Sequence, residues 1–179
     1  MDTFQIILCI VIVVVIILLL CTYIYNKIKT QILKINSAES EIDGSLREKY
    51  DIIVKLISEI KQIDKNIKFN NYEKIKDEDL SSFEFERKLA DLENQIYTSK
   101  NDNDKLLKNS TISNLWYEMV NINTKIKAQE KYYNESTTIY NGLVTKFPSK
   151  LIAVIMRLKE KKYFDGKDMY DDNIKDFKI

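Results

Sequence analysis

Apolar residues recur along much of the chain at intervals of three, four or seven positions, the spacing of one face of an α-helix. One such stripe covers residues 28–67, and a second covers residues 112–147. Only Gly44 interrupts the first stripe, and a single glycine inside a helix costs about 1 kcal/mol. A weaker pattern of the same kind covers residues 79–100. The sequence therefore predicts three long helices, the first of which extends to near residue 68.

An almost unbroken apolar run, Phe4–Tyr25, precedes the first stripe. A helix of this length, at a rise of about 1.5 Å per residue, crosses a hydrocarbon core of about 30 Å. Its β-branched residues would favour a strand in water, but in lipid every backbone group must be satisfied within the segment, which requires a helix. Tyr23 and Tyr25 then lie where an interfacial aromatic belt is expected. We predict a transmembrane anchor over residues 1–25 that continues into the first helix.

The flanks of this run favour an uncleaved anchor over a secretory signal. No basic residue precedes it, no small-residue cleavage site follows, and Leu20 stands where a lipoprotein signal needs a small residue before Cys21. Cys9 and Cys21 are about 18 Å apart along a helix, too far for a disulfide. The lysines after the run predict an N-terminus outside the cell and a cytoplasmic helical region: Lys27, Lys29 and Lys34.

Turn and capping signals set the other helix boundaries. Asn70-Asn71 is the first turn signal, and residues 99–105 form a polar loop. A capping box anchored at Ser82 is not expected, because Phe85 occupies its last position. The start of the third helix can be capped by any of three residues: Asn109, Ser110 or Thr111.

The single proline, Pro148, follows Phe147, and the residue before a proline is disfavoured in the helical conformation. We expect the third helix to stop at Phe147 with its ring packed into the bundle, and Ser149 to cap a short helix beyond it. Residues 149–164 combine an apolar block with basic residues. This segment either lies in the membrane interface as an amphipathic helix or caps the bundle core.

No stripe can be buried by one helix alone, so the helices must pack against each other. We predict an all-α protein in which the transmembrane helix continues into a three- to four-helix up-and-down antiparallel bundle over residues 26–164. Residues 165–179 mix acidic and basic side chains and are expected to form a flexible tail.

Composition removes several classes of chemistry. The chain has no histidine, which excludes Ser-His-Asp and Cys-His catalysis and histidine ligation of zinc. Three glycines leave no phosphate-binding loop, and 28 basic against 27 acidic residues give no field for nucleic-acid binding. We therefore expect no catalytic residue, no cofactor, no metal and no nucleic-acid partner. Charged residues spaced by four are read as surface ion pairs: Asp43 with Arg47, and Asp51 with Lys55.

Two tyrosine–asparagine pairs, Tyr133-Asn134 and Tyr140-Asn141, are seven residues apart, so both tyrosines fall on one helix face. A third pair, Tyr25-Asn26, ends the apolar run. These pairs either form a recognition surface or have a structural role, with each hydroxyl or amide hydrogen-bonded to a neighbouring helix. With Phe147 and Pro148 they are the candidate interaction or structural residues.

The order of these residues resembles the bacterial LemA family. The resemblance is carried by Tyr25-Asn26, by AESEIDGSLREKYDIIVKLI (38–57), by LWYEMVNINTKIKAQEKYYNESTTIYNGLVTKFPSKLIA (115–153), and by KKYF (161–164) behind them. It covers about half of the chain. The chain departs from the family's pattern at Val54, where a proline is usual, and at Asn123, where a glutamate is expected. The family's histidine-glutamate stretch is missing, and the middle of the chain is short.

The resemblance implies a single-pass protein of the bacterial inner membrane with a helical-bundle domain and no established enzymatic activity. Together with the missing catalytic repertoire, it leads us to expect a membrane-anchored interaction or scaffold protein. Its partners would be the lipid bilayer and a protein or a second copy, bound through the helical faces. The alternative is a ligand-sensing or envelope-facing membrane protein that binds a small molecule or an envelope component.

Overall fold

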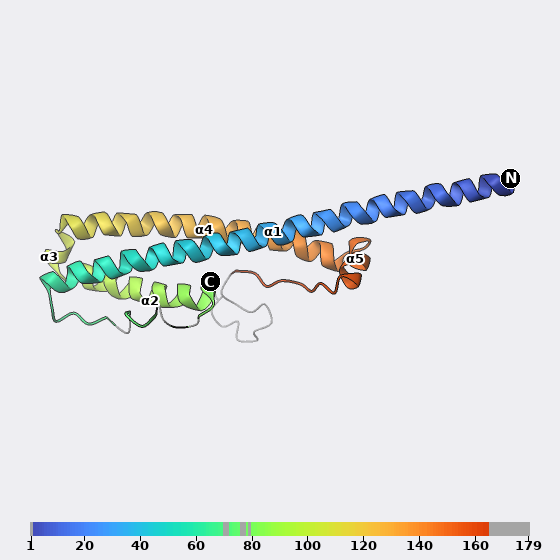
Figure 1. Ribbon diagram of the computed structural model, residues 1–179. Helices are drawn as coiled ribbons and strands as arrows, with labels where there is room; N and C mark the ends of the chain where they lie inside the picture. Colours follow the sequence, from blue (N-terminus) through green and yellow to red (C-terminus); the bar gives the residue numbers. More distant parts are fainter. Residues whose placement is uncertain (1, 70–71, 76–77, 79, 165–179) are drawn as a thin grey trace, which may run out of the picture. The chain divides into compact units, whose positions relative to one another are not determined.

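A computed structural model describes residues 2–69, 72–75, 78 and 80–164 (Figure 1). The described residues form helices and connecting segments without a strand, which confirms the predicted all-α class. The helices are α1 (Thr3–Ile63), α2 (Ser82–Asn101), α3 (Asp104–Leu107), α4 (Ser110–Thr145) and α5 (Ser149–Ile155). The predicted turn at Asn70-Asn71 and the predicted tail at 165–179 lie outside the described residues.

The helix ends follow local capping chemistry. The Asn109 side chain accepts a hydrogen bond from the backbone N–H of Ile112 at 3.0 Å, so Asn109 caps α4. A capping box does open α2, one residue earlier than the one considered from the sequence. The Ser81 hydroxyl accepts from the Glu84 N–H at 3.3 Å, and the Glu84 carboxylate accepts from the Ser81 N–H at 3.0 Å. The Ser81 hydroxyl also donates to the Glu84 carboxylate at 2.8 Å, and this hydrogen bond, followed by the one from the Ser81 N–H, lowers the pKa of Glu84.

The chain forms two compact units. The first consists of Met1–Ser37 with Tyr133–Tyr163, and the second contains Ala38–Tyr132. Helices α1 and α4 contribute to both units, whereas α2 and α3 belong to the second and α5 to the first. Each unit is described separately below.

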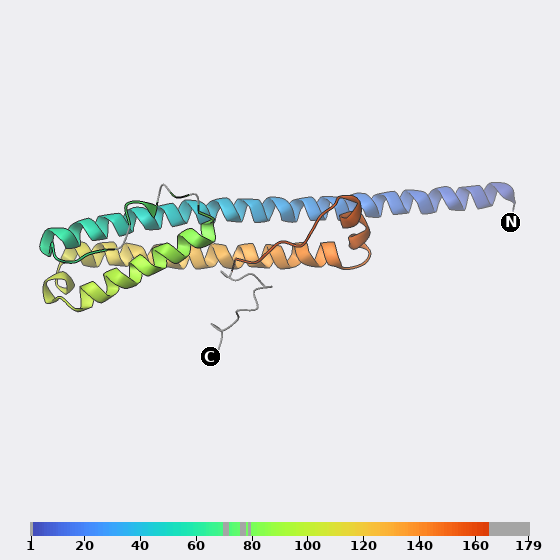
Figure 2. The same ribbon diagram turned by 90° about the horizontal axis from the view of Figure 1, so that it is seen from below.

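In the second unit, α2 and α4 pack along α1, as Figure 2 shows. The predicted stripe residues of α1 form the buried core here: Ile42, Leu46, Ile53, Leu56 and Ile60. From α2 the core receives Leu89, Leu92 and Ile96, and from α4 it receives Ile112, Met119, Ile122 and Ile126. The helical period read from the sequence therefore identified the buried face of each long helix.

Helix α2 runs parallel to α1, whereas a simple up-and-down order would make these two consecutive helices antiparallel. Near its start, the Ser82 hydroxyl donates to the Asp43 carboxylate of α1 at 2.7 Å. Just beyond its end, the Asn103 amide donates to the Asp64 carboxylate at 3.4 Å. Residue numbers thus increase together along α1 and α2, so these two helices are parallel and α4 is antiparallel to both (Figure 1).

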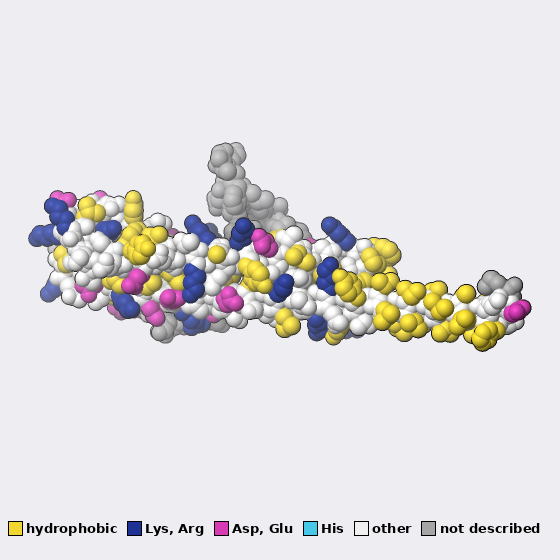
Figure 3. Space-filling model, turned by 90° about the horizontal axis from the view of Figure 1, so that it is seen from above, with side chains coloured by type: hydrophobic (Ala, Val, Ile, Leu, Met, Phe, Trp, Pro, Cys, Tyr) yellow, Lys and Arg dark blue, Asp and Glu magenta, His cyan; other side chains and the backbone are white. Residues whose placement is uncertain are grey.

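In the first unit, one face of α1 packs against the last part of α4 and against α5. The buried members of this cluster are Ile28, Ile35, Tyr140, Val144 and Ala153. By contrast, every residue from Asp2 to Tyr23 is exposed, and Figure 3 shows the hydrophobic side chains of this stretch on the surface. This part of α1 is long and apolar enough to cross a membrane. The predicted continuity of anchor and first helix is therefore present in the structure.

Candidate functional site

The tyrosine–asparagine pairs of α4 hold the chain that follows α5. The Tyr140 hydroxyl donates to the carbonyl of Lys159 at 2.9 Å, and the Tyr133 hydroxyl donates to the carbonyl of Lys162 at 3.3 Å. Their spacing of seven places both hydroxyls along one side of the helix. Tyr140 is buried, and this burial raises the pKa of its phenol. Both hydroxyls therefore hydrogen-bond to a non-helical segment, where the sequence indicated a neighbouring helix.

The Asn141 amide makes two hydrogen bonds to the backbone of one residue. Its amide nitrogen donates to the carbonyl of Lys161, and its amide oxygen accepts from the N–H of the same residue, both at 2.9 Å. The Lys161 ammonium also donates to the Asn36 side chain on α1 at 3.3 Å. Because residues 156–164 are not helical, their backbone groups need partners of this kind.

The remaining predicted site residues lie on α1, on α4 and between α4 and α5. Tyr25 and Asn26 are exposed; the Lys29 ammonium lies 5.8 Å from the centre of the Tyr25 ring. The backbone carbonyl of Asn134 accepts a hydrogen bond from Thr138. Phe147 is 81% exposed, so the expectation that its ring packs into the bundle is wrong. Helix α4 ends at Thr145, two residues before that phenylalanine, and Pro148 occupies the N-cap position of α5.

The segment after Pro148 is helical over a shorter stretch than expected. Ser149 does not cap α5; it is the first helical residue, and its hydroxyl donates to the carbonyl of Lys146 at 3.0 Å. The helix ends at Ile155 because Arg157 adopts a left-handed conformation with φ of 54°. The N–H groups of Arg157 and Leu158 then donate back to the carbonyls of Val154 and Ala153, the pattern of a Schellman ending.

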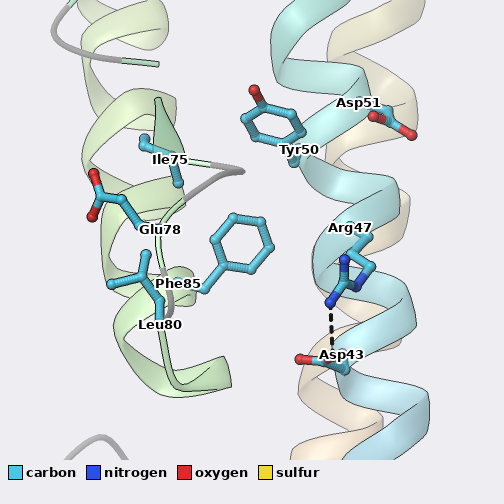
Figure 4. Close-up of a pocket in the computed structure, with 8 residues that line it drawn as sticks. All are labelled: Asp43, Arg47, Tyr50, Asp51, Ile75, Glu78, Leu80 and Phe85. Carbon is cyan, nitrogen blue, oxygen red and sulfur yellow. Dashed lines mark hydrogen bonds and ion pairs between the residues drawn. The ribbon is translucent and has the colours of Figure 1, made fainter. Parts of the chain in front are cut away.

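A pocket of about 290 Å³ lies in the second unit between α1 and the chain that leads into α2. Figure 4 shows the residues that line it: Asp43, Arg47, Tyr50, Asp51, Ile75, Glu78, Leu80 and Phe85. Three carboxylates and one guanidinium give the lining a net negative charge. Such a lining is suited to a small polar molecule that carries positive charge.

Internal contacts already engage part of this lining. The predicted pair is present: a guanidinium nitrogen of Arg47 lies 3.4 Å from the Asp43 carboxylate. The Tyr50 hydroxyl donates to the carbonyl of Tyr72 at 3.1 Å, and the Tyr50 ring lies 6.1 Å from that of Phe85. Asp51 supplies an exposed carboxylate to the pocket from α1, and Glu78 of the connecting segment pairs with Lys88 of α2.

A buried ion pair joins the three helices of the second unit. The Lys49 ammonium on α1 lies 2.8 Å from the Glu93 carboxylate on α2, with only 6% of the lysine side chain exposed. The other oxygen of Glu93 accepts from the Asn123 amide on α4 at 2.7 Å. The Glu93 carboxylate thus receives donors from two helices. These contacts offset the cost of burying the charges of Lys49 and Glu93.

A pair of carboxyl groups lies next to this ion pair. Burial raises the pKa of Glu130 to about 8, and the neighbouring Glu86 carboxyl adds to the rise through its charge and a hydrogen bond. Lys127 and Lys49 act in the opposite direction. One oxygen of Glu130 is buried without a hydrogen-bond partner. Glu130 therefore holds a proton near neutral pH, and this group makes the second unit sensitive to pH.

Exposed aromatic residues gather on another side of the second unit. The rings of Tyr97 on α2 and Trp116 on α4 are 5.8 Å apart, and the Lys100 ammonium lies 5.1 Å from the Trp116 ring. Tyr117 is 68% exposed, and Val120 is exposed one turn further along α4. We call Tyr97, Trp116, Tyr117 and Val120 the aromatic patch. Aromatic side chains of this kind are enriched at protein interfaces.

Sequence reasoning missed the aromatic patch, the pocket and the Glu86–Glu130 pair. Tyr117 and Val120 are apolar positions of α4 that fall outside its buried stripe, and this could have indicated the patch from the sequence. The carboxyl pair had no such signal, because its members are far apart in the sequence and on different helices. Among the described residues, no three acidic or cysteine side chains are grouped as a metal site would require.

Comparison with known families gives one match. A sequence model of the LemA family matches residues 38–175. Neither a curated protein nor a solved structure matches the chain. The matched range begins thirteen residues after Tyr25, so the match does not depend on the apolar span.

Proposed function

The chain belongs to the LemA family, and on this basis we propose that it is a membrane-anchored interaction or scaffold protein without catalytic activity. Family membership and the apolar helix together support a membrane-associated protein of the LemA type. In the proposed arrangement, Phe4–Tyr25 crosses a bacterial cell membrane once, and the helical units present their faces to a partner. The absence of catalysis rests on the sequence, which has no histidine and no phosphate-binding loop.

The aromatic patch is the observation that supports the interaction role. Tyrosine and tryptophan supply most of the binding energy in many interfaces, because they bury a large area at a small cost in conformational entropy. The patch sets them on two packed helices: the rings of Tyr97 and Trp116 pack at an angle of 36° across the α2–α4 contact, which fixes their position before a partner arrives. The proposed partner is a protein or a second copy of this chain.

Site-specific photo-cross-linking tests this role. A benzophenone amino acid replaces Tyr117 in the full-length chain in its own membrane, and a control replaces the exposed Lys125, which lies on the side of α4 opposite Trp116. We expect a discrete adduct from position 117 and little from position 125. The mass of the adduct then distinguishes a second copy from another protein.

A further substitution links the adduct to the patch. Trp116→Ala removes the largest side chain of the patch, so the yield from position 117 should fall severalfold. Equal yields at positions 117 and 125, or a yield that Trp116→Ala does not change, would refute the interaction role of this surface.

We also propose the sidedness of the protein. The span is followed by three basic residues, Lys27, Lys29 and Lys34, whereas the charged side chain before it is the acidic Asp2. Because basic residues favour the cytoplasmic side, the helical units lie in the cytoplasm and the N-terminus lies outside. Protease added to intact cells should leave residues 26–179 uncut until the cells are lysed. Digestion of this segment without lysis would show the opposite orientation and would favour an envelope-facing role.

A second candidate function is ligand sensing through the pocket of the second unit. Its mixed lining of Asp43, Asp51, Glu78 and Arg47 fits a small cation or zwitterion. Spermidine and lysine are suitable probes, and binding would appear as a rise in the unfolding temperature of the full-length chain. Asp51→Asn should abolish this rise if the ligand occupies the pocket, whereas the exposed control Asp91→Asn should leave it unchanged. A rise that Asp51→Asn leaves unchanged would exclude the pocket as the binding site.

A further inference from the structure

Helix α5 buries one side and exposes the other. Ser149 and Ala153, one turn apart, are buried, and Ala153 belongs to the core cluster of the first unit. The opposite side, together with the residue before Pro148, carries four large apolar side chains with high exposure: Phe147 (81%), Leu151 (60%), Val154 (65%) and Ile155 (81%). We call these four residues the outer patch. Contiguous exposed apolar groups of this kind mark contact surfaces in soluble units.

The position of α5 along α1 decides what the outer patch can contact. Ile152 and Ala153 share one cluster with Ile24 and Ile28 of α1, and both views of the chain place α5 beside this part of α1 (Figures 1 and 2). Ile24 lies inside the apolar run. Ile28 lies about 5 Å beyond Tyr25, the end of that run, at the rise of a helix.

A bilayer has a headgroup layer on each side of its hydrocarbon core that is roughly 5–7 Å thick. When the apolar span crosses the core, α5 therefore falls at the depth of this layer. In that arrangement the outer patch lies beside the end of the α1 surface that lipid covers.

The charge around the outer patch matches anionic lipid. Residues 146–158, which contain the outer patch, hold three of the 28 basic residues and none of the 27 acidic residues, a net charge of +3, so the remaining sequence carries −2. Lys146 and Lys150 are exposed on either side of Phe147. Their long side chains can place the ammonium groups among lipid phosphates while the apolar residues enter the layer below.

We propose that the outer patch inserts into the interfacial layer of a bilayer that contains anionic lipid, on the side where α1 leaves the membrane. An apolar helix face flanked by lysines is the pattern of helices that lie in this layer. The buried side of α5 ties the contact to α1, so the first unit is held to the membrane at two points. Insertion of the outer patch requires that the apolar span is a membrane anchor, which the proposed function also assumes. It does not require the partner that the proposed function assigns to the aromatic patch.

Fluorescence quenching in nanodiscs tests the proposal on the full-length chain. Cys9→Ala and Cys21→Ala remove the native cysteines, and a single cysteine labelled with an environment-sensitive dye replaces Leu151. The matched control carries the label at Leu33, an equally exposed leucine (69%) of the same unit, about 12 Å beyond Tyr25 along α1. Each disc holds one chain in phosphatidylcholine with phosphatidylglycerol. The quenchers are a nitroxide on the lipid chain and iodide in water.

We expect the lipid nitroxide to quench the label at position 151 at least about threefold more than the label at position 33, because only the former reaches the interfacial layer. Iodide should show the reverse order. Equal access of iodide to both positions would overturn the proposal. Protection of position 151 from both quenchers would also overturn it, since protein and not lipid would then cover the patch.

Charge variants test the role of anionic lipid separately. The double variant Lys146→Glu, Lys150→Glu should lower nitroxide quenching at position 151 to the level measured in phosphatidylcholine alone. The control Lys105→Glu, Lys108→Glu makes the same change in net charge at exposed residues of the second unit, and should leave the quenching unchanged. Equal quenching in both double variants would overturn the requirement for anionic lipid. Cross-linking from Tyr117 should be unaffected in all of these variants, which separates this proposal from the interaction role.

Discussion

The raised pKa of Glu130 predicts that the stability of the second unit depends on pH. Its pKa rises from the ordinary value of 4.5 to about 8 in the folded chain, chiefly through burial and then through the charge and hydrogen bond of Glu86. The folded state therefore holds this proton more tightly than the unfolded state does. The free energy of unfolding should fall as the pH rises from about 4.5 to about 8, and this contribution should be constant outside that window.

The size of the effect can be bounded. A rise of 3.5 pKa units would correspond to about 5 kcal/mol lost across the whole window, at 1.36 kcal/mol per unit. The Glu130 side chain is only half-buried, so water screens part of this interaction and we expect about 1–2 kcal/mol. Glu130→Gln keeps the shape and the ability to donate a hydrogen bond to Glu86, but it cannot ionise. The variant should match the wild type near pH 5 and exceed its stability by this amount near pH 8.

Denaturant unfolding of the full-length chain in nanodiscs measures this effect. Trp116 is the single tryptophan and lies in the same unit as Glu130, so its fluorescence reports the relevant transition. Glu118→Gln removes an exposed carboxyl from the same helix and should keep the wild-type pH slope. If Glu130→Gln keeps that slope too, or is less stable than the wild type near pH 8, the assignment of a proton to Glu130 is wrong.

Three further substitutions test local contacts at the start of α2, at the end of α5 and along residues 156–164. Ser81→Ala removes the two hydrogen bonds of the Ser81 hydroxyl with Glu84, one to the backbone N–H and one to the carboxylate, and should destabilise the second unit by about 1 kcal/mol in the same unfolding assay. Asn141→Ala removes two hydrogen bonds to Lys161, so hydrogen exchange at the amide of that lysine should become severalfold faster while exchange in α2 stays unchanged. Arg157→Gly relieves a left-handed conformation at a non-glycine residue and should raise the free energy of unfolding by about 1 kcal/mol. A lower free energy of unfolding would show that contacts of the arginine side chain stabilise the fold by more than its backbone conformation costs.

Local patterns in the sequence determined the elements of this protein. A helical period depends on residues within one or two turns, so the buried faces of α1 and α4 could be predicted before any contact was known, as Ile53 and Met119 illustrate. The apolar run determined the membrane-compatible part of α1 in the same way, because length and hydropathy are properties of a single segment. The order of motifs indicated the LemA family, which the match to residues 38–175 confirms.

Tertiary structure alone decided how these elements meet. The apolar stripe of α2 is compatible with either direction relative to α1; the direction follows from where the connecting chain ends, at the contact of Ser82 with Asp43. The spacing of Tyr140 and Asn141 indicated one helix face but not their partner, a non-helical segment about twenty residues away. The high pKa of Glu130 likewise depends on the desolvation and the second carboxyl that packing supplies. Contacts between distant segments depend on the path of the chain in space, and no local period of residues encodes that path.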